Sequence, residues 1–177
     1  MSIRTLRLAV AADRPAIDAI YAHYVRTSTC TFAESVESDD ARAAWFEAHG
    51  PRHPITVLEA DGEVLGWASL SPWKSRSAYR HSVELSIYVR HDSLYRGLGR
   101  ELMADLIARA ESLGYRALIG GVTSEQTASL RLHERFGFES VARFRDVGFK
   151  FGRWLDVVYL ERLLSGPRDA SGGGGAS

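Results

Sequence analysis

One segment in the middle of the chain most constrains what it can fold into: an alternating strand, then a glycine turn and a long helix. Over residues 82–89, apolar and polar side chains alternate as in a half-buried strand. The apolar set is Val83, Leu85, Ile87 and Val89. Residues 100–113 repeat apolar side chains at helical spacing, and Gly114 ends the pattern. A strand joined to a helix in this way is typical of α/β proteins.

The rest of the chain continues this mixture of strands and helices. Further strands are predicted over residues 3–9, 55–60, 63–70, 115–122, 138–144 and 155–163. Further helices are predicted after Asp13, over residues 38–49 with Ser38 as N-cap, and over residues 126–136. Asp61-Gly62 predicts a hairpin between two of the strands. The order β-α-α-β-β-β-α-β-α-β-β predicts an α/β fold with mixed strand direction.

Length and charge narrow the class of protein. The 177 residues suit one domain, which we place at residues 1–164, followed by a disordered Gly/Ser-rich tail at 165–177. Lys and Arg number 22, as do Asp and Glu, so there is no electrostatic reason to expect nucleic acid or an anionic membrane as partner. Cys30 is the only cysteine, which excludes an intrachain disulfide. Because no apolar run suits a signal peptide or membrane span, we expect a soluble, cytoplasmic protein.

The turn before the helix at 100–113 has the properties of a phosphate site. Gly97 and Gly99 lack a Cβ, so the backbone there can approach a ligand closely. Free N–H groups at the helix start face the same space, and Arg96 and Arg100 add positive charge. The spacing fits neither the Rossmann fingerprint nor a P-loop. An ordinary tight turn would also use two such glycines.

The same turn resembles the acetyl-CoA loop of the GNAT acetyltransferases, whose pattern is Gln/Arg-x-x-Gly-x-Gly/Ala. Residues 94–99 match it without a gap, and the departure is Leu94. Four other segments resemble the phosphinothricin and methionine sulfoximine acetyltransferases of that superfamily. They are Thr27-Ser28-Thr29 with Phe32, Ser71–Tyr79, Ser129–Phe138, and the signature Gly-x-Lys-x-Gly-x-Trp-x-Asp at Gly148–Asp156. The resemblance covers residues 3–163 and implies the GNAT acyl-CoA N-acyltransferase fold, a mixed, mostly antiparallel sheet flanked by helices.

The resemblance implies acetyl-CoA as cosubstrate. The residues that would hold it are Ile87, Tyr88, Val89, Tyr95, Arg96, Gly97, Leu98, Gly99, Arg100 and Gln126. Leu94 and Gln126, which replace the family's usual Gln/Arg and Asn, leave the cofactor affinity open. No metal is expected, because Gly50-Pro51 breaks any helix between His49 and His53.

Two residues are the catalytic candidates. Acetyl transfer needs a base for the ammonium proton and an acid for the departing thiolate. Glu84 is the one carboxylate in the strand at 82–89. Its spacing equally suits an exposed edge glutamate, whereas the resemblance implies a general base. His133 is the candidate acid, where family members often have tyrosine; the alternative is a partly buried histidine on a helix face. The resemblance also implies that backbone N–H groups near Tyr88 polarise the carbonyl.

The resemblance implies substrate contacts from Phe32, Trp73, Lys74, Ser75, Arg76 and Tyr79, in addition to Glu84. Lys74 or Arg76 would pair with a substrate carboxylate, although solvated loop charges are the plainer interpretation. We therefore predict an N-acetyltransferase that acts by direct attack on the amine of a small amino-acid-like compound, as a homodimer. The alternatives are a GNAT enzyme for another small amine, such as a polyamine or aminoglycoside, or for a peptide N-terminus, and a non-catalytic acetyl-CoA-binding module.

Overall fold

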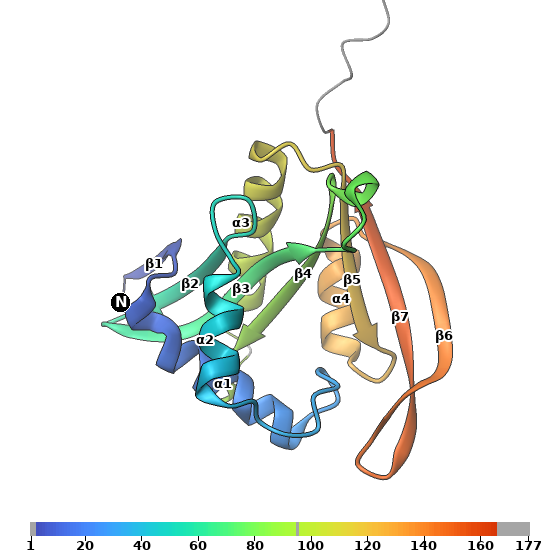
Figure 1. Cartoon of the computed structure of the whole chain (residues 1–177), viewed down its shortest axis with the longest axis horizontal. Coiled ribbons are helices and arrows are strands. Elements are labelled where there is room, and N and C mark those ends of the chain that lie inside the picture. Colours follow the sequence, from blue (N-terminus) through green and yellow to red (C-terminus); the bar gives the residue numbers. More distant parts are fainter. Residues whose placement is uncertain (1–2, 95, 166–177) are drawn as a thin grey trace, which may run out of the picture.

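The strands of the computed structural model, which describes residues 3–94 and 96–165, form one seven-stranded sheet in the order β1-β2-β3-β4-β5-β7-β6 (Figure 1). They are β1 (Arg4–Leu8), β2 (Ile55–Ala60), β3 (Glu63–Pro72), β4 (Ser82–Val89), β5 (Ala117–Thr123), β6 (Glu139–Lys150) and β7 (Arg153–Leu163). Only β4 and β5 pair in parallel. The expected mixed, mostly antiparallel sheet is therefore confirmed. Almost all of the predicted tail lies outside the described residues.

Helices cover both faces of the sheet (Figure 1). They are α1 (Arg14–Thr27), α2 (Asp39–Glu47), α3 (Leu98–Ser112) and α4 (Thr127–Arg135), with 3₁₀ turns η1 (Ala11–Asp13), η2 (Ser77–Tyr79) and η3 (His91–Ser93). Val57 packs in the cluster beneath α1, and its neighbour Leu58 packs in the cluster beneath α3. Because successive strand residues face opposite sides, the two clusters are separate layers.

The predicted N-cap of α2 and the predicted turn between β2 and β3 are both confirmed. Ser38 accepts a hydrogen bond from the Ala41 N–H at 3.2 Å, as expected of an N-cap. Asp61 and Gly62 both have positive φ, which suits a two-residue hairpin turn. Asp13 precedes α1 as predicted but does not cap it: its carboxylate accepts hydrogen bonds from the Arg7 side chain and from the Val10 N–H.

The C-terminal hairpin is longer than predicted. β6 continues to Lys150 and β7 begins at Arg153, so only Phe151 and Gly152 remain as the turn. A bulge interrupts β6 between Phe144 and Gly148. The alternation of apolar residues is lost at this bulge, which is why the sequence pattern ended the strand at 144.

The parallel pairing of β4 with β5 is short, and this positions the site. It joins Ser82–Glu84 to Ala117–Ile119 and stops there, although β4 continues to Val89 and β5 to Thr123. Tyr24 of α1 donates its hydroxyl proton to the Val89 carbonyl at 2.6 Å, which secures the far end of β4. Beyond Glu84 the two strands therefore diverge.

Candidate active site

A cavity of about 550 Å³ occupies the space between the diverging ends of β4 and β5. The turn before α3 and the inner side of α4 complete its walls. The predicted cofactor residues that line it are Ile87, Tyr88, Val89, Gly97, Leu98, Gly99, Arg100 and Gln126. Arg96 instead lines a separate hollow beside Arg4 and Arg90, and Tyr95 lies outside the described residues. We call this the β4–β5 cavity.

The start of α3 presents backbone donors to the β4–β5 cavity. Gly97 has a φ of +82° and serves as the N-cap residue. The N–H groups of Arg100 and Glu101 donate to the Gly97 carbonyl at 3.0 and 3.3 Å, while those of Leu98 and Gly99 have no intrahelical partner by helix geometry. Two such donors at the positive end of a helix suit an anion such as a pyrophosphate.

Two predicted cofactor residues contribute in other ways than expected. The Tyr88 side chain turns away from the cavity and stacks on Trp67, with ring centroids 4.8 Å apart, so only its backbone faces the β4–β5 cavity. The Gln126 amide donates to Thr29 Oγ1 at 3.0 Å and to Ser28 Oγ at 3.3 Å. Gln126 thus ties the cavity wall to the loop that follows α1.

His133 of α4 reaches the β4–β5 cavity with one nitrogen unoccupied. Its side chain is buried, with 4% of the residue exposed, and Nδ1 lies 2.8 Å from the Ser129 carbonyl oxygen. Because a carbonyl only accepts, Nδ1 carries the proton and Nε2 of the neutral ring is an acceptor. Nε2 has no hydrogen-bond partner among the described residues. Burial lowers the pKa of His133, so the imidazole must gain a proton at Nε2 before it can act as an acid.

A pair of glycines in β5 separates His133 from Glu84. A Cβ on Gly120 would lie 2.6 Å from His133 Nε2, whereas one on Gly121 would lie 3.6 Å from Glu84 Oε1 and 3.3 Å from the Tyr159 ring. Since neighbouring strand residues face opposite sides, His133 and Glu84 approach β5 from opposite faces. Our sequence analysis did not use this pair, although glycine inside a strand indicates close approach of another group.

Glu84 lies in a second cavity, of about 480 Å³, which we call the Glu84 cavity. It is lined by Cys30, Phe32, Glu84, Gly121, Thr123, Phe144, Val147, Val157 and Tyr159. Cys30, Gly121 and Thr123 line both cavities, so the two spaces meet there. The half-buried Glu84 carboxylate has no hydrogen-bond or salt-bridge partner within residues 3–94 and 96–165, and burial raises its pKa. An unpaired carboxylate of this kind is suited to accept a proton.

The predicted substrate residues are only partly brought together. Phe32 lies in the Glu84 cavity, and the Trp73 ring contacts Tyr159 of its wall with centroids 5.5 Å apart. The remaining four, Lys74, Ser75, Arg76 and Tyr79, line a separate exposed hollow of about 450 Å³. Tyr159 and the β6 residues of the cavity were missed in the sequence analysis, because they reach Glu84 through pairing between distant strands.

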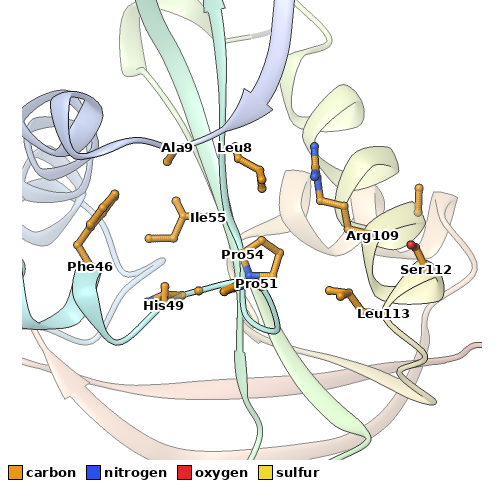
Figure 2. Close-up of a pocket in the computed structure, with 12 residues that line it drawn as sticks. Leu8, Ala9, Phe46, His49, Pro51, Pro54, Ile55, Arg109, Ser112 and Leu113 are labelled. Carbon is orange, nitrogen blue, oxygen red and sulfur yellow. The ribbon is translucent and has the colours of Figure 1, made fainter.

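Another hollow, of about 600 Å³, lies away from these residues (Figure 2). Figure 2 shows Phe46, Pro54 and Leu113 around it, near the ends of α2 and α3. His49 on its edge is already paired with the Trp45 carbonyl and Ser71.

In the part of the chain that the structure describes, no three His, Cys, Asp or Glu side chains are grouped as metal ligands. None of the described helices is long and apolar enough to cross a membrane.

Comparisons with known proteins show similarity to acetyltransferases over most of the chain. Residues 6–159 match the family described as the acetyltransferase (GNAT) domain. The phosphinothricin N-acetyltransferase of Alcaligenes faecalis is 44% identical over 91% of this chain and 83% of its own length. The L-methionine sulfoximine/L-methionine sulfone acetyltransferase of Salmonella typhimurium is 39% identical over 90% of this chain and 94% of its own. A phosphinothricin acetyltransferase from Sinorhizobium meliloti, solved in complex with acetyl-CoA, superimposes with a TM-score of 0.89 at 34% identity and covers 94% of both chains.

Proposed function

The chain belongs to the GNAT acetyltransferase family, and we propose that it acetylates the α-amine of small amino-acid-like compounds of the phosphinothricin and methionine sulfoximine type. Its cosubstrate is acetyl-CoA. One observation carries the proposal: two cavities meet at Gly121, one beneath the N-terminus of α3 and the other holding Glu84. A thioester donor and an amine acceptor require such a pair of separate approaches to one reacting carbonyl.

The residues of the β4–β5 cavity fit acetyl-CoA. The Leu98 and Gly99 N–H groups and Arg100 would hold the pyrophosphate, and the unpaired stretch of β4 after Glu84 would accompany the pantetheine arm. Leu98 is a core residue, so its contribution is its backbone N–H. The acetyl group would then point toward Gly121, where the cavities join.

The proton transfers follow from the positions of Glu84 and His133 on opposite faces of β5. Glu84 takes a proton from the substrate ammonium, which frees the lone pair for attack on the thioester carbonyl. The C–N bond forms, the C–S bond breaks, and the thiolate leaves on the His133 side of β5. The attacking nitrogen loses its second proton, which His133 accepts at Nε2 and passes to that thiolate. Backbone N–H groups around Tyr88 and Val89 would polarise the carbonyl.

Lys74 or Arg76 would pair with the substrate carboxylate. Their loop follows Trp73, whose ring already contacts the wall of the Glu84 cavity. Because both cations are exposed and line a separate hollow, this role requires the loop to move toward that cavity when substrate binds.

The test is a panel of amines with acetyl-CoA, followed by thiol release and product mass. Phosphinothricin or methionine sulfoximine should be turned over, and an acetylated product should form. Lys74→Ala or Arg76→Ala should raise the KM for that substrate about 10- to 100-fold, as expected for the loss of a charge-assisted hydrogen bond. Thiol release with other amines but with neither of these two would contradict the substrate class.

We further propose that the chain is a homodimer in the cytoplasm, where acetyl-CoA is available. The β6–β7 hairpin supports self-association, because it carries exposed large apolar side chains: Val141, Phe144, Val147, Phe149, Phe151, Trp154 and Leu163. β6 is also an edge strand of the sheet (Figure 1). A long apolar edge is a ready surface for a second copy of the same chain.

A further inference from the structure

Lys150 is buried at the end of β6 without a carboxylate partner. Only 2% of the residue is exposed, and no salt bridge reaches it within the described ranges. Its Nζ donates instead to two backbone carbonyls, that of Ser28 at 2.7 Å and that of Thr31 at 2.8 Å. A buried ammonium is costly unless it is well hydrogen-bonded, and a methionine would fill the same space without that cost. The distinctive property of lysine here is a set of donors directed at one loop.

That loop, residues 28–32, forms part of the wall of both cavities. Cys30 lines each of them, and Phe32 lines the Glu84 cavity. The Phe32 ring packs against Gly148, where a Cβ would overlap the ring. Gly148 precedes Lys150 by two residues, so both lie on the same face of β6. One face of β6 thus contacts the loop at two residues, Gly148 and Lys150.

The other side of the loop is attached to the end of β5 and to the turn that follows it. Thr123 donates its hydroxyl proton to the Thr29 carbonyl at 2.6 Å, and Thr29 in turn donates its own hydroxyl proton to the Glu125 carboxylate. Arg153 of β7 holds the same carboxylate with two hydrogen bonds of 2.7 Å. The cofactor side of the loop therefore has its own attachments, which do not involve Lys150.

We propose that Lys150 is a positioning residue for the amine substrate: by holding the Ser28 and Thr31 carbonyls, it keeps Phe32 and Cys30 in place as the wall of the Glu84 cavity. The inference rests on the proposed function only in assigning the Glu84 cavity to the amine. It also explains two members of the C-terminal signature, since Gly148 leaves room for the ring and Lys150 binds the loop. Because Thr29 is attached independently, acetyl-CoA binding should not depend on Lys150.

The first experiment compares Lys150→Met with the wild type in steady-state kinetics. We expect the KM for the amine to rise at least about 10-fold, as for the loss of one charge-assisted hydrogen bond or more, and the KM for acetyl-CoA to stay within about twofold. Arg135→Met is the matched control, because Arg135 is an exposed cation of α4 with no side-chain partner in the described structure. Equal rises in both KM values, or none, would overturn the positioning role.

A second readout follows the loop itself and works even if no tested amine is acetylated. Cys30 is the only cysteine, is half-buried and lies inside the loop, so dithionitrobenzoate reports its position. Burial raises the pKa of the Cys30 thiol and the positive charge of Lys150 opposes that rise, so removing the charge alone would slow the reaction. Release of the loop predicts the opposite, a labelling rate several-fold faster in Lys150→Met. Unchanged or slower labelling would show that Lys150 does not hold the loop.

Gly148→Ala gives an independent variant should Lys150→Met fail to fold. The added methyl group must displace the Phe32 ring, so the amine KM should rise while the acetyl-CoA KM holds. In a Phe32→Ala background the same change should have little further effect, because the obstructed ring is gone. An equal effect of Gly148→Ala in both backgrounds would overturn the seating of the loop on β6.

Discussion

Glu84 and His133 are both withdrawn from water, and burial moves their pKa values in opposite directions. Desolvation disfavours the charged form, so it raises the pKa of Glu84 and lowers that of His133. The first change makes Glu84 a stronger base than a glutamate in water. The second keeps His133 neutral, with its lone pair on the nitrogen that faces Gly120. Both residues owe their suitability for catalysis to their surroundings.

Glu84→Gln should lower kcat by about 10²–10⁴-fold, because the amide keeps the shape of the side chain but cannot accept the proton. In the wild type, the activity is present above the raised pKa of Glu84 and is lost as the pH falls through it. The acidic limb of kcat/KM should therefore lie above about 4.3, the ordinary pKa of glutamate, and should weaken in the variant. Acetyl-CoA affinity should not change. Wild-type kcat in Glu84→Gln, with chemistry rate-limiting, would remove Glu84 from the mechanism.

His133→Gln should lower kcat by about 10²-fold if His133 protonates the thiolate. Because burial lowers the pKa of His133, the ring is in the neutral, proton-accepting form above that pKa, so kcat in the wild type should fall as the pH drops through it, and this fall should be absent in the variant. Profiles of kcat against pH, measured at saturating substrates for the wild type and the variant, test this role of His133. Superimposable profiles would leave the thiolate to be protonated by water.

At the scale of elements, the turn between β4 and α3 leaves the start of the helix facing the β4–β5 cavity, where we propose that acetyl-CoA binds. Gly97 adopts the left-handed conformation that this turn requires, and the helix then begins with Leu98. Gly99 has an ordinary φ, and a Cβ there would make only van der Waals contact with Leu132 and Val89. The space left by Gly99 is therefore available to a ligand and is not needed for folding.

Gly99→Val should remove acetyl-CoA binding while leaving α3 intact. Ligand at about 100 times its Kd stabilises a protein by about 2.7 kcal/mol, so the wild type should show a clear rise in Tm with acetyl-CoA and the variant should show none. Gly50→Val is the control: Gly50 has open space around it, no positive φ and no place in the β4–β5 cavity. A normal Tm shift in Gly99→Val would show that the phosphates lie elsewhere.

At the scale of the whole molecule, apolar surface is concentrated at one edge of the sheet. Phe149 and Trp154 contact each other across the β6–β7 pair with ring centroids 5.0 Å apart, yet both are exposed. The opposite edge has fewer: Leu8 is the exposed large apolar residue within β1, and Ile3 and Val10 are exposed beside that strand. Clustered exposure of this kind indicates an interface more strongly than single residues do.

Light scattering should give about twice the 19.6 kDa chain mass for the wild type. Phe149→Asp places a charge in the proposed interface and should shift the protein toward the single-chain mass. Leu8→Asp, at the β1 edge, should leave the mass unchanged. A single-chain mass for the wild type at micromolar concentration would contradict the homodimer.

The sequence by itself determined the features that depend on neighbouring residues. Alternation predicted β4, helical spacing and Gly114 bounded α3, and Asp61-Gly62 placed the first hairpin. The motifs also identified the family. Each of these signals is local, because the periods of strands and helices and the conformations of turns are set within a few residues.

Only the tertiary structure decided how the proposed catalytic and positioning residues lie relative to one another. The divergence of β4 from β5 after Glu84 depends on how far two distant strands pair, and no local pattern specifies that. Lys150 meets the Ser28 carbonyl across 122 residues of sequence. Likewise, His133 and Glu84 reach opposite faces of β5 only because Gly120 and Gly121 leave room for them. These contacts arise from packing between layers, and packing depends on the shapes of all the elements together.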